Sequence, residues 1–165
     1  MSDSNVTQAY KPSVEPAVIE RVQAAIEAIY QEKMHRVTRI KDHIWVISQT
    51  GYNLSVIVTH LLVIFDAEMF ETMAAERQPY LEELLHLNAH QVKDAKFCLL
   101  KEATHLRVLC DNTKIDEERI RNYLTEFKEL YLVLETQLAE RFFPDLETAE
   151  DVATSVEAPP EDQII

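Results

Sequence analysis

Glycine is almost absent from this chain, which has one glycine, Gly51, in 165 residues. Loops that cradle phosphate groups need several glycines, because the backbone must approach the phosphate closely. The sequence therefore argues against P-loop and dinucleotide-fingerprint chemistry. It also contains no Gly-x-Ser-x-Gly motif of the kind that presents a serine nucleophile. We expect no cofactor.

Basic residues are scarce, with 16 Lys and Arg against 29 Asp and Glu and a formal net charge of −13. Nucleic acids and anionic membranes require concentrated Lys and Arg, so we expect neither as a partner. Residues 144–165 contain seven acidic residues and no Lys or Arg. This composition predicts a disordered, solubilising tail, with a recognition role as the alternative.

Cysteine is also rare, and the two thiols, Cys98 and Cys110, lack the spacing of a metal-binding pair. Each lies in an apolar, β-like segment, which predicts free buried thiols in a reducing compartment. The first residues show no basic and apolar regions of a secretion signal, and no apolar run reaches the roughly 20 residues of a membrane-spanning helix. We therefore expect a soluble, cytoplasmic protein.

The most informative segment that is present runs from Leu54 to Phe65. It is rich in β-branched residues, has no Gly or Pro, and predicts one long strand or two abutting strands. Strict alternation would give two largely apolar faces. The first comprises Leu54, Val56, Val58, His60, Leu62 and Ile64, and the second comprises Ser55, Ile57, Thr59, Leu61, Val63 and Phe65. A chain this short usually covers one face of a sheet, so we expect a partner to cover part of the other.

Periodicity elsewhere predicts an α+β domain with the element order α-β-β-α-β-β-α. An antiparallel sheet from two hairpins would pack against three helices, in one domain over 16–143, with 1–15 disordered and the tail following. The predicted elements are a helix capped by Ser13 from Pro16 to about 33, a hairpin over about 36–65, helical structure over 66–78 and 79–91, a hairpin over 95–111, and a helix over 116–143.

Two local details of these elements follow from residue types. Centring the second hairpin turn on Ala103 places Cys98 opposite Val108, and Cys110 opposite Lys96. Thr113, with Asp116 three residues later, resembles a capping box at the start of the last helix.

His86 and His90 have the spacing of a metal-ligand pair, because residues four apart share one face of a helix. A third ligand could come from Asp94 or His105, and the alternative is that both histidines are ordinary surface or partly buried residues. The pair remains a weak candidate, and we expect neither a metal nor catalytic residues. Adjacent acidic pairs such as those at 82–83 and 117–118 point in different directions on a helix and cannot flank one bond.

Four short segments carry a resemblance to a known family. They are Glu83-Leu-Leu-His-Leu-Asn-Ala89, Asp94-Ala-Lys-Phe-Cys-Leu99, Leu106-Arg-Val-Leu-Cys-Asp111 and Ile115-Asp-Glu-Glu118. In this order they resemble the YbjN-like, type III secretion chaperone-like superfamily, in an uncharacterised branch with a domain of unknown function. The resemblance implies an antiparallel sheet with helices on one face, frequently a homodimer, and partner chains bound over apolar surface. It implies no catalytic residues.

We therefore predict a non-enzymatic protein-interaction module, chaperone-like and homodimeric, that uses apolar sheet and helix surface. The candidate partner contacts are Val56, Val58, Leu62, Leu132 and Val133. The alternative is a small-ligand sensor or an enzyme with a pocket between the sheet and the helices, lined by His43, Trp45 and His60. A third possibility is that helices and termini cover both faces of the sheet within one chain.

Overall fold

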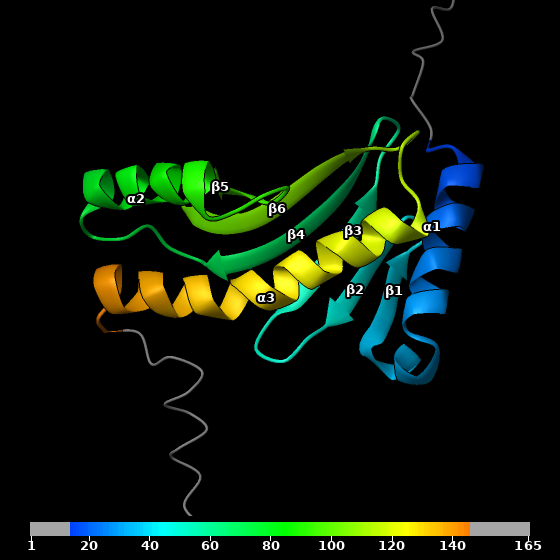
Figure 1. The fold of residues 1–165 in the computed structure, drawn as a ribbon, viewed down its shortest axis with the longest axis horizontal. Helices are drawn as coiled ribbons and strands as arrows, with labels where there is room; N and C mark the ends of the chain where they lie inside the picture. Colours follow the sequence, from blue (N-terminus) through cyan, green and yellow to red (C-terminus); the bar gives the residue numbers. More distant parts are fainter. Residues whose placement is uncertain (1–13, 146–165) are drawn as a thin grey trace, which may run out of the picture.

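A computed structural model describes residues 14–145 as one six-stranded antiparallel sheet with three α-helices (Figure 1). The strand order is β1-β2-β3-β4-β6-β5, and the predicted α+β class is confirmed. The elements are α1 (Pro16–Ile29), the 3-10 helix η1 (Gln31–Arg36), β1 (Val37–Lys41), β2 (Ile44–Ser48), β3 (Asn53–Val58), β4 (Leu62–Phe70), α2 (Arg77–His90), β5 (Lys96–Leu100), β6 (Ala103–Asp111) and α3 (Glu117–Phe142). The expected disordered ends lie largely outside the described residues, and so does Ser13, but the N-cap residue of α1 is Glu15, so the predicted Ser13 cap was wrong.

The sheet has six strands, so the prediction of two hairpins was wrong. The β-like segment before Gly51 divides into β1 and β2, and the segment from Leu54 to Phe65 divides into β3 and β4. A turn separates β3 from β4, in which the Oγ1 atom of Thr59 accepts a hydrogen bond from the backbone N–H of Leu62 at 2.9 Å. A local side-chain bond of this kind favours a turn over a continuous strand.

This turn also decides which side chains face the helices. Val58 lies opposite Val63 in the β3–β4 register, and both side chains are buried. Strict alternation through the turn would have placed them on opposite faces. The buried side of the two strands therefore combines residues from both predicted faces: Leu54, Val56, Val58, Val63 and Phe65.

Two helical predictions also need correction. The chain from Asp66 continues as β4 to Phe70 and then forms a loop, where we expected helical structure over 66–78. The first helix ends at Ile29 and is followed by η1, whereas we expected it to extend to about residue 33. The spacing of apolar residues did not predict where β4 and α1 end, because strand pairing and tertiary packing override local helix propensity.

The N-cap of α3 is Asp116, and Thr113 does not form the predicted capping box. The Asp116 side chain accepts a hydrogen bond from the backbone N–H of Arg119 at 2.8 Å. Thr113 instead donates its hydroxyl proton to the Asp111 carboxylate at 2.6 Å. Short Asp side chains bond readily to nearby backbone N–H groups, so either residue type suits a cap.

The register of the second hairpin differs from the prediction as well. Cys98 lies opposite His105, and Cys110 lies opposite Val63 of β4. The turn is centred on Lys101 and Glu102, and Lys101 adopts a positive φ of 61°. Cys110 is consequently buried beneath the helices, while Cys98 is half-buried on the other side of the sheet, and both thiols are free.

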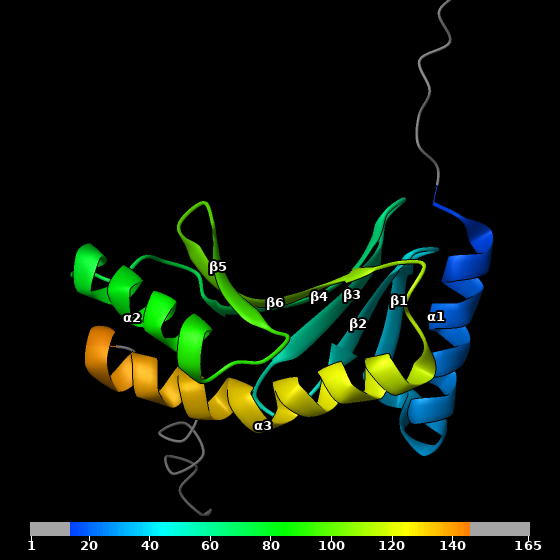
Figure 2. The same ribbon diagram turned by 45° about the horizontal axis from the view of Figure 1, so that its top comes forward.

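The core lies between one side of the sheet and the helices, and α3 crosses that side diagonally (Figure 2). Phe65 of β4 packs edge-on against Tyr123 of α3, with ring centroids 5.3 Å apart. At the far end of α3, Tyr80 of α2 packs against Phe142, with centroids 5.2 Å apart. These contacts place α2 and α3 on the same side of the sheet, and α1 joins them there because its Gln23 accepts the indole N–H of the buried Trp45 (Figure 2).

Candidate functional site

The side of the sheet without helices carries a row of apolar side chains that crosses four strands. We call this side the open face, since no helix of residues 14–145 covers it (Figure 2). Direct cross-strand partners connect Ile44 to Ile57, Ile57 to Ile64, and Ile64 to Leu109. Because cross-strand partners point to the same side of a sheet, these four residues form one continuous apolar row.

The row is partly accessible to solvent. Leu109 is 58% exposed, while Ile44, Ile57 and Ile64 are half-buried because neighbouring side chains shield them. Leu62 lies beside the row and is half-buried too. Connected apolar surface of this kind is uncommon on monomeric proteins and marks interaction sites.

A polar cluster lies next to the apolar row on β4 and β6. Asp66 accepts a hydrogen bond from Nε of Arg107 at 2.8 Å, and its other carboxylate oxygen is 3.1 Å from Nδ1 of His105. Nε2 of His105 is 3.6 Å from a carboxylate oxygen of Glu68. The side chains of Asp66 and His105 are only 14% and 9% exposed, so this cluster is a fixed part of the open face.

Cys98 lies opposite His105 on the same face. A thiol beside a histidine is the pairing found in cysteine nucleophiles, where the histidine acts as the base. Burial raises the pKa of the Cys98 thiol, so the sulfur remains protonated at neutral pH. Among the described residues, no hydrogen bond joins the Cys98 sulfur to His105. The geometry therefore supports a structural role for this thiol.

The charges of the open face nearly balance, unlike those of the whole chain. Three carboxylates lie on it, those of Asp66, Glu68 and Asp111, together with the cations Lys41 and Arg107. The formal net charge of the protein is −13. The open face is thus much less acidic than the average surface.

The predicted partner contacts fall into three groups. Val56 and Val58 are 0% and 1% exposed beneath the helices, so their assignment to a partner surface was wrong. Leu62 lies on the open face, and Val133 is 63% exposed on α3. Leu132 is 36% exposed and lies against the turn that contains Gly51.

Sequence reasoning did not select Ile44, Ile64 and Leu109 as contacts, and it left Ile57 as an open alternative. The turn at Thr59 is the signal that would have placed Ile57 and Ile64 on one face, because it changes the alternation pattern between β3 and β4.

His86 and His90 are both exposed on α2, with ring centroids 4.6 Å apart. The suggested third ligand His105 is instead held by acidic residues on the sheet, and Asp94 lies in the loop before β5. Within residues 14–145, no group of three or more His, Cys, Asp or Glu side chains is arranged to hold a metal ion.

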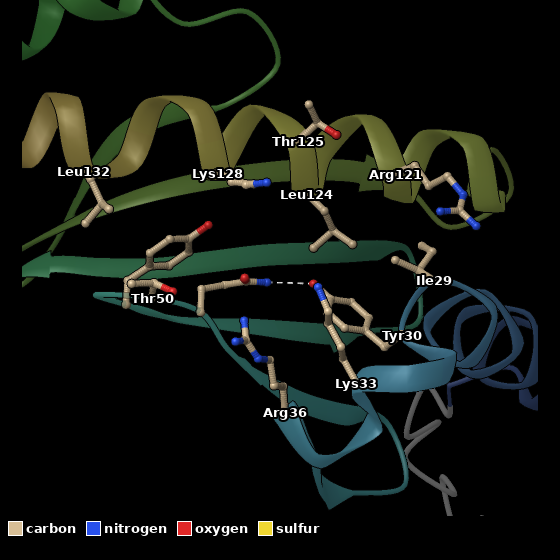
Figure 3. A pocket seen from close by; sticks show the side chains of 12 residues that line it. Ile29, Tyr30, Lys33, Arg36, Thr50, Arg121, Leu124, Thr125, Lys128 and Leu132 are labelled. Carbon is tan, nitrogen blue, oxygen red and sulfur yellow. Dashed lines mark hydrogen bonds between the residues drawn. The ribbon is translucent and has the colours of Figure 1, made fainter.

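A cleft of about 580 Å³ lies between the end of α1, the β2–β3 turn and α3 (Figure 3). Its lining differs from the predicted pocket residues His43, Trp45 and His60. Trp45 is buried and donates its indole N–H to Oε1 of Gln23 at 2.6 Å. The lining residues are Ile29, Tyr30, Lys33, Arg36, Gln49, Thr50, Tyr52, Arg121, Leu124, Thr125, Lys128 and Leu132.

Comparison with known proteins adds no family assignment. No protein-family model matches the chain, and no curated protein matches it either. In the part of the chain that the structure describes, no helix combines the length and apolar character needed to cross a bilayer.

Proposed function

We propose that this protein is a non-enzymatic interaction module of the cytoplasm that forms a homodimer through the open face. The observation that carries this proposal is the apolar row from Ile44 through Ile57 and Ile64 to Leu109. Covering this row removes apolar surface from water, which is the main driving force of association.

Charge favours a second copy of the chain as the occupant. Two molecules that each carry a net charge of −13 repel one another in most relative orientations. This repulsion is weakest where the local charges balance. The open face presents both signs, because Asp66 lies opposite Arg107 and Lys41 lies opposite Ile44 at the end of the apolar row. A two-fold axis brings identical faces together, so a face with both signs is able to pair them across the interface.

The chaperone-like part of the proposal depends on the family resemblance. A sheet with helices on one side and an uncovered apolar face is the arrangement which that resemblance implies. Client chains would bind over the same kind of surface, as extended or helical segments with apolar anchors. Support for this part therefore comes from the arrangement of the elements, together with the Leu87-Asn88 step in the last turn of α2, before β5.

Sedimentation equilibrium of matched variants tests the dimer. Leu109→Asp introduces a charge into the apolar row at a residue that is 58% exposed, and Leu85→Asp introduces the same charge on α2 at a residue that is 68% exposed. We expect the wild type and Leu85→Asp to be dimers, and Leu109→Asp to be a monomer, since a buried unpaired carboxylate is costly. Circular dichroism checks that each variant is folded.

Asp is unfavourable in strands, so Leu109→Thr provides a second variant that keeps β-propensity while removing apolar area. It should weaken the dimer without lowering strand content. A wild-type protein that is monomeric at every accessible concentration would contradict the homodimer, as would equal association of Leu109→Asp and Leu85→Asp.

The alternative function, small-ligand binding, has a specific observation in its favour. The cleft beside α3 gathers cationic side chains in an acidic protein. This cleft lies on the helix side of the sheet, away from the open face.

A further inference from the structure

The cleft between α1, the β2–β3 turn and α3 is lined by cations from two separate parts of the chain. Lys33 and Arg36 come from η1, while Arg121 and Lys128 come from α3. Figure 3 shows the four side chains around one hollow. No Asp or Glu is among the residues that line it. The charge of the cleft is therefore opposite to that of the molecule.

This concentration runs against the composition of the protein. The chain has 16 Lys and Arg, and four of them line this one cleft. Within residues 14–145, Lys33, Arg36 and Lys128 form no ion pair, and Arg121 bonds only to Glu117 on the preceding turn of α3. Cations that lie close together without counter-charges repel one another, and a bound anion removes this cost.

The rest of the lining provides hydrogen-bond donors and an apolar wall. The side-chain amide of Gln49 donates to the hydroxyl oxygen of Tyr30 at 2.7 Å, which leaves the Tyr30 O–H proton free to donate. Burial raises the pKa of Tyr30, so this hydroxyl stays neutral at physiological pH. Ile29, Leu124 and Leu132 form the apolar part. A few polar groups in an otherwise apolar concavity are typical of small-molecule sites.

We propose that this cleft binds a small phosphate monoester with an apolar body. A phosphate monoester carries close to two negative charges and three acceptor oxygens, which suits the unpaired cations Lys33, Arg36 and Lys128. The cleft volume of about 580 Å³ falls in the range of small-molecule pockets. A long polyanion such as RNA is disfavoured, because the surrounding acidic protein repels it. This inference does not depend on the proposed dimer.

Calorimetric titration of the full chain at constant ionic strength tests the proposal. The probes are phenyl phosphate, inorganic phosphate and benzoate, which separate the contribution of the phosphate from that of the apolar body. We expect saturable binding with one site, tightest for phenyl phosphate, weaker for inorganic phosphate and weakest for benzoate. Affinity should fall as salt is added, because part of the attraction is electrostatic.

A matched pair of double variants assigns the binding to the cleft. Arg36→Gln with Lys128→Gln removes two cleft cations and should weaken phenyl phosphate binding at least about tenfold, since hydrogen bonds to charged groups are the strong ones. Arg77→Gln with Lys114→Gln makes the same charge change at exposed sites outside the cleft and should leave the affinity unchanged. Thermal unfolding of each double variant shows whether it remains folded.

Three results would overturn the proposal. One is the absence of saturable heat with all three probes, and another is an equal loss of affinity in both double variants, which would indicate general charge screening. The third is binding that appears only after Glu147→Gln, Glu150→Gln and Asp151→Asn are combined, because the occupant would then be the chain's own acidic segment.

Discussion

The only glycine of the chain lies where both backbone conformation and space require it. Gly51 has a φ of +86° in the turn between β2 and β3. A Cβ atom at this position would lie 2.7 Å from Cδ2 of Leu132 on α3. Gly51 therefore allows the turn to lie close to α3, where Thr50 and Tyr52 on either side of it line the cleft.

We predict that Gly51→Ala destabilises the protein for two separable reasons. The left-handed conformation costs an L-residue about 1–2 kcal/mol, and the new methyl group meets Leu132. In a Leu132→Ala background the steric part disappears and the backbone part remains. Urea denaturation of the four proteins in this cycle should show a smaller but non-zero cost of Gly51→Ala when Leu132 is absent. A cost of zero in both backgrounds would show that the turn adopts another conformation.

At the scale of elements, the side-chain amide of Asn88 makes two hydrogen bonds between α2 and the edge strand β5. The Asn88 side chain donates to the carbonyl oxygen of Phe97 at 3.1 Å and accepts from the backbone N–H of Phe97 at 2.7 Å. The loop between α2 and β5 is held from the other side by Glu126 of α3, whose carboxylate accepts from the backbone N–H groups of Lys93 at 2.8 Å and Asp94 at 3.0 Å. Polar side chains thus fix this hairpin to both helices.

Asn88→Ala should lower the free energy of unfolding by about 1–3 kcal/mol, because it leaves the two Phe97 backbone groups without these partners. Asn122→Ala is the matched control on the exposed surface of α3, where Ala is the better helix former, so stability should stay equal or rise slightly. Both values come from chemical denaturation. Equal stability of the two variants would mean that the bridge contributes nothing.

How much of the α2–loop–β5 unit could be predicted from the sequence depends on whether the contacts are local or long-range. The Leu-Asn step at the end of α2 was recognisable from the sequence, and helix, loop and strand follow in the expected order. The acceptance of three backbone N–H groups by Glu126 was not foreseeable, since Ala95 and Glu126 are 31 residues apart. Long-range pairs of this kind arise from tertiary packing and leave no local pattern.

At the scale of the molecule, buried tyrosines make the fold sensitive to alkaline pH. Burial raises the pKa of Tyr52 and of Tyr80 from an ordinary 10.0 to about 12. Tyr52 stacks on Tyr131, whose pKa burial also raises. Each phenol therefore gives up its proton less readily in the folded chain than in the unfolded chain.

A raised folded-state pKa means that this contribution to stability is complete below pH 10 and is lost as pH rises towards about 12. We expect the free energy of unfolding to decrease through this interval, with tyrosinate absorbance rising together with loss of circular dichroism. In urea the same phenols should titrate near 10. Tyrosines that ionise near pH 10 while the fold persists would contradict the expected burial.

The sequence by itself determined the fold class, the lack of glycine-rich phosphate-binding loops and the negative net charge of the protein. These properties follow from composition and from apolar periodicity, which act locally. Tertiary structure alone decided which side chains of the segment from Leu54 to Phe65 face the helices, because the turn at Thr59 changes the alternation. It also decided where the few basic residues gather: Lys33 and Lys128 are 95 positions apart in the chain and meet in one cleft only when α3 packs against α1. Scarcity of basic charge over the whole chain therefore did not exclude a concentration of it at one site.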